Sequence, residues 1–147
     1  MSIKLNEFIP ENSTILINKW IDQLDISLKF VKSRKTKLGD FRYDIKSGFQ
    51  ITINDDLNPF STLITLTHEI AHAFTHKSFG NRVKPHGEEW KKTYKSLMIN
   101  FLTIDVFPED ILSSLSHYLI NPLASTSNDI NLSLSLRKYD QIQALTI

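Results

Sequence analysis

The sequence contains no cysteine among its 147 residues. This absence excludes disulfide bonds, a thiolate nucleophile and any zinc site built on cysteine sulfur. A metal site in this chain must therefore use histidine and carboxylate ligands. The chain holds five histidines that could serve.

Long apolar segments are also missing. No run approaches the roughly 20 apolar residues that a transmembrane helix needs, and the first twenty residues mix charges and a proline among their apolar side chains. We therefore expect neither a signal peptide nor a membrane anchor. The expected location is the cytoplasm, with no membrane partner.

The chain has almost no net charge. Its 17 basic and 16 acidic residues leave +1, which argues against a protein that coats nucleic acid. The charge is nevertheless uneven, because the segment Lys29–Lys46 carries an excess of basic residues. Strand alternation there would place Lys29, Val31, Ser33 and Lys35 on one face. We expect either an ordinary solvated sheet face or a modest positive surface for weak association with DNA.

The composition, 41% apolar and 22% charged, is that of an ordinary globular domain. We expect one domain over residues 1–147, with its catalytic core at about 10–101 and a helical segment and tail at about 108–147. The oligomeric state is left open.

The order of apolar periodicities predicts an α+β fold. A first helix is expected from Pro10 to Leu24, and three short strands are expected around 26–32, 41–43 and 49–53. A broad apolar helix should begin at Asn58-Pro59 and end at 78–81, followed by helices at about 87–101 and 108–120. The segment 124–131 resembles a polar linker, and the residues after it fit either a short helix or a strand.

The motif HEIAH, residues 68–72, lies in the middle of the predicted apolar helix. Residues four apart share a helix face, so His68 and His72 can bind one metal ion at roughly 2.0–2.1 Å. Glu69 is rotated by about 100° from His68, outside the ligand set but close enough to act on water at the metal. The alternative is two hydrogen-bonded histidines beside a solvated glutamate, although burying such groups without partners in an apolar helix costs much free energy.

A zinc site needs a third protein ligand. His76 lies about 12 Å along the helix from His68 and cannot share an ion with both histidines of the motif. His117 belongs to a later amphipathic helix and fits a surface position better. The metzincin pattern would require a histidine where Ser78 stands. We therefore favour His86, at the start of the third helix.

Carboxylate ligands stay open as alternatives to His86. Glu88, Glu89 and the more distant Asp105 are the candidates, although acids in the first turn of a helix also complement its dipole without any metal. The side chain that would stabilise an oxyanion is not identified. Tyr94 is conceivable, but its spacing with Trp90 and Met98 favours a place in the core.

With these residues in place, the sequence resembles the SprT-like family of zinc metalloproteases. Four segments carry the resemblance: SRKTKLGDFRY, FQITINDDLNP, LITLTHEIAHAF and PHGEEWKKTYKSLM. Together they span about residues 26–101, and the following FPEDILSSLSHYLINPLAS also looks like bacterial members. The combination is far more specific than the HExxH motif alone.

The resemblance implies a zincin-like α+β core whose small sheet packs against the first helix and the HExxH helix. It implies Zn²⁺ bound by His68, His72 and His86, with Glu69 as the catalytic base of peptide-bond hydrolysis. Eukaryotic relatives digest proteins crosslinked to DNA, which makes protein substrates near DNA an expectation here. Many relatives carry a cysteine zinc ribbon or another DNA-binding extension, and this chain has no cysteine.

Two further expectations concern substrate and class. In zincins a strand beside the active-site helix can pair with an extended substrate, and we expect that role for the strand Gln50–Asn54. Its residues are Gln50, Ile51, Thr52, Ile53 and Asn54. The competing class is a non-catalytic zinc protein on the same scaffold, associated with nucleic acid. The presence of Glu69 favours an enzyme, because a structural zinc site needs no base.

Overall fold

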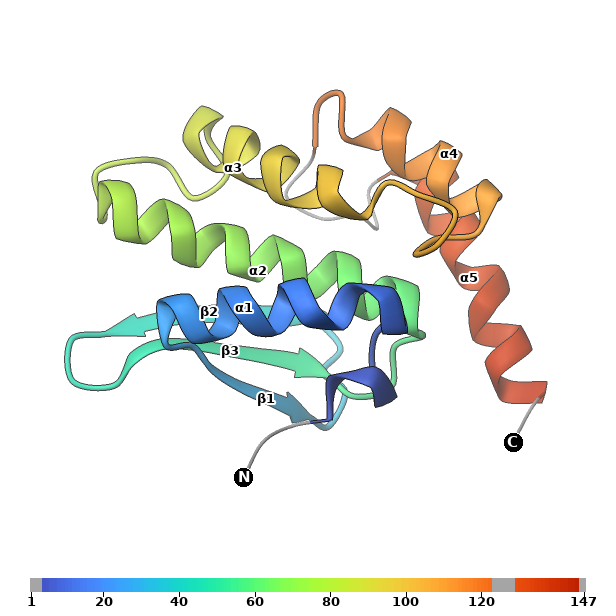
Figure 1. Cartoon of the computed structure of the whole chain (residues 1–147), viewed down its shortest axis with the longest axis horizontal. Helices are drawn as coiled ribbons and strands as arrows, with labels where there is room; N and C mark the ends of the chain where they lie inside the picture. Colours follow the sequence, from blue (N-terminus) through green and yellow to red (C-terminus); the bar gives the residue numbers. More distant parts are fainter. Residues whose placement is uncertain (1–3, 123–128, 146–147) are drawn as a thin grey trace.

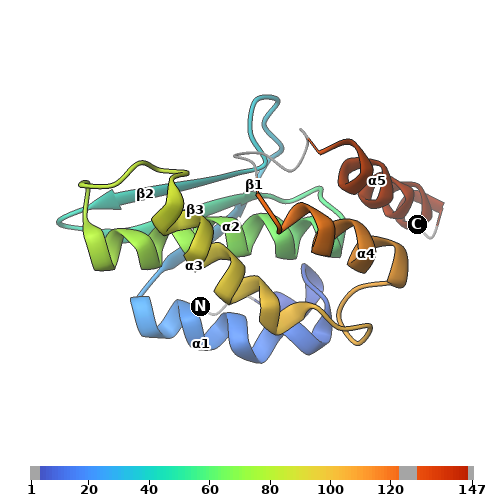
Figure 2. The same ribbon diagram turned by 90° about the horizontal axis from the view of Figure 1, so that it is seen from above.

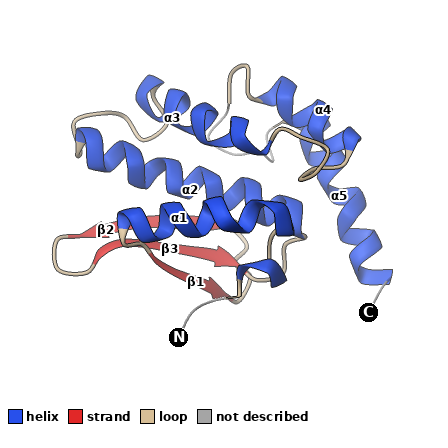
Figure 3. Cartoon of the chain, in the orientation of Figure 1, coloured by secondary structure: helices blue, strands red, loops and turns tan. Residues whose placement is uncertain are grey.

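The computed structural model describes residues 4–122 and 129–145, and the side chains up to residue 140. Within them a small mixed sheet lies beneath a layer of helices (Figure 1, Figure 3). The helices are α1 Thr14–Leu24, α2 Pro59–Phe79, α3 Glu88–Met98, α4 Glu109–Tyr118 and α5 Ile130–Leu145, and the strands are β1 Ser27–Val31, β2 Gly39–Asp44 and β3 Gly48–Asn54. The predicted α+β class and three-stranded sheet are confirmed. None of the described helices is both long and apolar enough to cross a membrane.

The sheet has the strand order β1-β3-β2. β1 pairs parallel to β3, with Ser27 opposite Gln50 and Val31 opposite Asn54. β2 pairs antiparallel to β3, so Gly39 lies opposite Ile53. The strand Gln50–Asn54 therefore lies at the centre of the sheet, where its backbone bonds to β1 on one side and to β2 and Leu38 on the other. The prediction that this strand pairs with a substrate is wrong, because it has no free edge.

Helix α2 lies along the sheet, with α3 above it and α1 below it in the view of Figure 1, and Figure 2 shows α3 crossing α2 obliquely. Asn58 caps its first turn by accepting a hydrogen bond from the Ser61 N–H at 2.9 Å, and Pro59 stands at the start. Gly80 ends it, because its φ of 63° lies in a region that favours glycine. The apolar residues of α2 pack against the sheet and both flanking helices, so the predicted deep burial is confirmed.

The core around α2 is rich in aromatic side chains. Trp20 of α1 meets Phe74 of α2 and Phe101 edge-on, at ring-centroid distances of 6.4 Å and 5.6 Å. Trp90 and Tyr94 of α3 are fully buried against the other side of α2. Burial of such rings contributes roughly 25 cal/mol per Å² of apolar surface, so these contacts hold α2 firmly in place.

Four expectations about the elements need correction. β1 ends at Val31, so residues 32–38 form a loop and the predicted strand face through Lys35 does not form. The first helix begins at Thr14 rather than at Pro10, because residues 11–13 form a 3-10 turn. The third helix ends at Met98 and continues as a single 3-10 turn. The last segment is a helix of 16 residues rather than a short element, and it begins at Ile130.

Helix α5 packs against the N-terminal end of α2. The Nδ2 atom of Asn58 donates to the Leu136 carbonyl at 3.0 Å and to the Asp140 carboxylate at 2.7 Å. Tyr139 of α5 donates to Asp110 of α4 at 2.8 Å. The predicted linker at 124–131 lies largely outside the described residues.

Candidate metal and catalytic site

The helix α2 supplies the first part of the site. His68 and His72 lie one turn apart on the same face, and their rings are 5.0 Å apart between centroids. Glu69 is buried on a neighbouring face that points toward β2. This arrangement follows directly from 3.6 residues per turn, which separates the two imidazoles from the carboxylate between them.

A tight turn brings His86 to the same place. The Gly87 N–H donates to the Lys84 carbonyl at 3.1 Å, which closes a four-residue turn with Pro85 at its second position. Proline is favoured at this position because its ring fixes φ near the value that the turn requires. Helix α3 begins directly afterwards, so His86 points back at α2.

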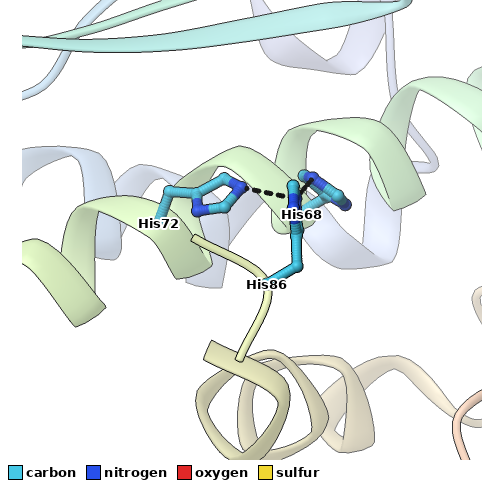
Figure 4. Close-up of side chains that lie close together, drawn as sticks. All are labelled: His68, His72 and His86. Carbon is cyan, nitrogen blue, oxygen red and sulfur yellow. Dashed lines mark hydrogen bonds between the residues drawn. The ribbon is translucent and has the colours of Figure 1, made fainter. Parts of the chain in front are cut away.

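The three imidazoles converge on one point (Figure 4). The Nε2 atom of His86 lies 3.1 Å from that of His72 and 3.2 Å from that of His68. Tetrahedral bonds of about 2.0–2.1 Å separate ligand atoms by about 3.3 Å, so these distances fit three ligands of one zinc ion. Two ring nitrogens this close need a proton or a cation between them. Three ring nitrogens around one centre are typical of a metal site. Among the described residues, these three form the group of His, Asp and Glu side chains that could hold a metal.

Trp90 packs against all three imidazoles of the histidine cluster. Its ring lies 4.7 Å from His68, 5.4 Å from His72 and 4.7 Å from His86 between centroids. Its indole N–H donates to the His68 carbonyl at 3.3 Å. One fully buried side chain therefore packs under all three imidazoles and ties α3 to α2.

Burial keeps the three imidazoles neutral. It lowers the pKa of His68 to about 3 and that of His72 to about 4, with a further contribution from the neighbouring imidazoles. Burial also lowers the pKa of His86. Neutral imidazoles offer lone pairs, so the cluster is ready to bind a cation at neutral pH without first losing protons.

Glu69 occupies a different environment on the β2 side of α2. Burial and, to a smaller extent, the Asp40 carboxylate raise its pKa to about 8, against the lowering effect of Arg34 and Lys37. A carboxyl whose pKa lies near neutrality can both accept and release a proton during a reaction. A cation held by the histidines would lower this pKa toward the ionised form.

A pocket of about 640 Å³ opens over the histidines and Glu69. Its walls come from the loop and first residues of β2, from α2, and from the segment between α2 and α3. β2 is an edge strand, so one side of its backbone has no neighbouring strand among the described residues. The first residues of this strand also line the pocket. The pocket can therefore admit an extended chain.

The other candidates from the sequence lie elsewhere. Glu88 and Glu89 occupy the first turn of α3, where acids complement the helix dipole. Asp105 and His117 are exposed. His76 lines the pocket one turn beyond His72, and its ring lies against that of Tyr43 at 4.3 Å. Tyr94 is fully buried, and its hydroxyl lies 3.5 Å from the Ile64 carbonyl, so its predicted place in the core is confirmed.

Sequence reasoning missed two contributors to the site. Trp90 was assigned only to an apolar helix face, although its position four residues after His86 indicates that it returns to the same end of α3. Gly39 begins β2 and faces Glu69, although no motif in the sequence points to it. Only the three-dimensional packing shows that glycine's role.

Several side chains of the basic segment bind other parts of the chain. Arg34 donates to the side chains of Asn54 and Thr52 at 2.9 Å and 2.8 Å, which fastens the loop to β3. Asp40 forms ion pairs with Lys37 and Arg42 at 3.2 Å and 2.8 Å. The exposed basic residues of the segment outside these contacts are Lys29, Lys32, Lys35 and Lys46. Association with DNA through this segment stays a prediction.

Known proteins resemble the chain over different lengths. Protein SprT of Pseudomonas fluorescens (strain Pf0-1) and of Pseudomonas aeruginosa (strain LESB58) are each 56% identical to it over 27 residues. Protein SprT of Pseudomonas savastanoi pv. phaseolicola is 52% identical over a stretch of the same length. That stretch is 18% of this chain and 16% of each relative, so the alignments span only a small part of the curated relatives.

No solved structure matches the chain significantly. The family comparison covers far more of the sequence, because the SprT-like family model matches residues 5–110. This range holds the whole sheet, α2, the three clustered histidines and α3. The chain belongs to the SprT-like family.

Proposed function

We propose that this chain is a zinc-dependent metallopeptidase that hydrolyses peptide bonds of protein substrates. The observation that carries the proposal is the convergence of three neutral imidazoles next to a buried carboxyl in an open pocket. Family membership supports it, since the resemblance noted from the sequence is to metalloproteases. A purely structural zinc site would need neither the glutamate nor the pocket.

Each residue has a distinct role in this proposal. His68, His72 and His86 would hold the ion at the wall of the pocket. Zinc supplies Lewis acidity toward water and the substrate carbonyl. Glu69 accepts the proton of the attacking water and delivers it to the leaving amine. Tyr94 takes no part, because its hydroxyl is buried beside Ile64.

We further propose that an extended substrate pairs with the free edge of β2. This strand replaces Gln50–Asn54 in that role, because β2 borders the pocket and β3 is enclosed. Backbone pairing binds any extended segment whatever its sequence, which suits unfolded or partly unfolded protein substrates. DNA-bound proteins are one such class, and the exposed lysines near β1 and β2 are compatible with it.

Zinc content and proteolysis of an unfolded protein test the function in three variants. We expect Glu69→Gln to keep zinc and to lose at least about a thousandfold in cleavage, because the ligands stay while the base is lost. His86→Ala should weaken zinc binding and lower cleavage together. Glu88→Gln, a change of an exposed acid in α3, is the matched control and should behave as the wild type. Normal cleavage by Glu69→Gln would overturn the role of Glu69 as the base, whereas a wild type that binds zinc but cleaves nothing would support a non-catalytic zinc site.

A further inference from the structure

Gly39 lies where β2 passes closest to the buried carboxyl of α2. A Cβ atom built on Gly39 would lie 2.8 Å from Cγ2 of Thr65 and 3.0 Å from Oε2 of Glu69. It would also lie 3.0 Å from Cδ1 of Ile53. Real Cβ atoms essentially never approach other atoms as closely as the first of these contacts. A side chain at this position would therefore force its neighbours to shift.

Backbone conformation does not explain this glycine. Positive φ values occur at Gly48 and Gly80 but not at Gly39. Gly39 is instead paired in the sheet opposite Ile53, where any residue could adopt the extended conformation. The close approach of Thr65 and Glu69 is the remaining reason, and these two residues share a face of α2 because they are four apart.

The neighbouring residues on β2 show how closely the strand follows the site. Phe41 is the next residue of the strand on the same side, and its ring stacks near His72 at 5.8 Å between centroids. A metal ligand is thus packed against a ring one step from Gly39. At Gly39 the pocket wall consists of backbone atoms only, and the Glu69 carboxyl occupies the space that a side chain would take.

We propose that Gly39 is a positioning residue for Glu69. Its lack of a side chain lets the carboxyl lie against the backbone of β2, in the pocket that the three imidazoles also line. This inference rests on the proposed function for its catalytic meaning, but the contact itself does not. An added methyl group would displace the carboxyl, because the glutamate side chain rotates more freely than the β-branched Thr65.

A thermal double-mutant cycle on the metal-free protein tests the contact without any activity. We expect Gly39→Ala to lower Tm by about 5 °C, which is the usual size of an overpacking effect in a chain of this length. The loss should shrink by about half when Glu69→Ala is also present, since the carboxyl no longer meets the methyl group. Thr65→Ser should recover a separate share by removing Cγ2. An equal loss with and without Glu69 would overturn the proposal.

Kinetics of the zinc-loaded protein test the catalytic consequence. A displacement of about 1 Å costs roughly a hundredfold in rate, so Gly39→Ala should lower kcat by about that factor with KM within about twofold. Zinc content should match the wild type, and Thr65→Ser alone is the control. The Gly39→Ala/Thr65→Ser double variant should regain part of the lost Tm but stay slow. Recovery of kcat together with Tm would reduce Gly39 to a stability role and refute the proposal.

The two tests separate this proposal from the proposed function. Cleavage by the wild type that is lost in Glu69→Gln supports the function, whatever Gly39→Ala does. If the wild type cleaves no substrate, the function fails, and the thermal cycle still decides whether Gly39 makes room for the Glu69 carboxyl. A cycle with no coupling between the two residues refutes the positioning role in either case.

Discussion

The helix that carries His68 and His72 and the turn that carries His86 hold the same kind of ligand in different surroundings. α2 has 21 residues, is capped at Asn58 and packs against the sheet, α1 and α3. The turn at 84–87 is closed by one backbone hydrogen bond, and Lys84 and Pro85 are exposed. The helix fixes two ligands by its own geometry, whereas the third depends on the fold that returns α3 to α2.

The largest difference should appear when one ligand is removed from each region. We expect His72→Ala to weaken zinc binding by about a thousandfold or more, because it breaks the pair that the helix presents in advance. His86→Ala should weaken it by about a hundredfold, since the helix pair stays intact. Competition with a calibrated chelator measures both constants. Equal losses would show that the turn is as well organised as the helix.

Acid should distinguish the same two regions in the metal-free protein. Burial lowers the pKa of His68 to about 3, so the folded state binds its proton less readily than the unfolded state, where the pKa is near 6.5. Stability is therefore lost as the pH falls from about 6.5 toward 3. His68→Gln should remove more of this loss, about 1 kcal/mol or more, than His86→Gln, because burial lowers the pKa of His86 less strongly. Urea unfolding at pH 7 and pH 5 gives the comparison, and identical pH slopes in both variants would contradict it.

Trp90 joins the two regions, so its replacement should affect both. Trp90→Phe removes the hydrogen bond to the His68 carbonyl and part of the surface beneath the imidazoles. We expect a loss of about 1–2 kcal/mol in the free energy of unfolding and about tenfold in zinc affinity. Trp20→Phe, in the core on the other side of α2, is the matched control. It should lower stability alone, and an equal loss of zinc affinity there would contradict the local role of Trp90.

The smallest effect should come from the turn itself. Pro85→Ala leaves every ligand in place but removes the ring that fixes the backbone before His86. The added freedom of the unbound turn should cost about 0.4–1 kcal/mol, or two- to fivefold in zinc affinity. Pro59→Ala at the start of α2 is the matched control and should leave zinc affinity unchanged. A larger effect at Pro59 would reverse the ranking of the two regions.

The sequence predicts the helical half of the site better than the rest of it. The four-residue spacing of His68 and His72 follows from the helix period alone, and Asn58-Pro59 marks where that helix begins. Joining His86 to them needed elimination and a family resemblance, because no local pattern states where a turn folds. The position of Gly39 against Glu69 has no periodic signal at all.

The sheet shows a second limit of the same kind. The alternation of apolar and polar residues predicts all three strands but carries no information on their order. It therefore cannot show that the strand Gln50–Asn54 is enclosed by the other two. This limit has a physical origin. Side-chain pattern reports which faces are buried, while strand order depends on which backbone edges find partners, and the backbone is nearly the same at every residue.

The packing of β2 on α2 sets a rule for how this chain can change length over evolution. Gly39 faces Glu69, Phe41 faces His72 and Tyr43 faces His76. From Gly39 to Tyr43 the strand advances about 13 Å, and from Glu69 to His76 the helix advances about 10.5 Å, so the two elements stay roughly in step across the site. Inserting or deleting one residue within β2 would turn Phe41 outward and bring a side chain against Glu69. Insertions should therefore accumulate at the hairpin tip near residues 45–47 and in the loop before Gly39, while β2 keeps its length.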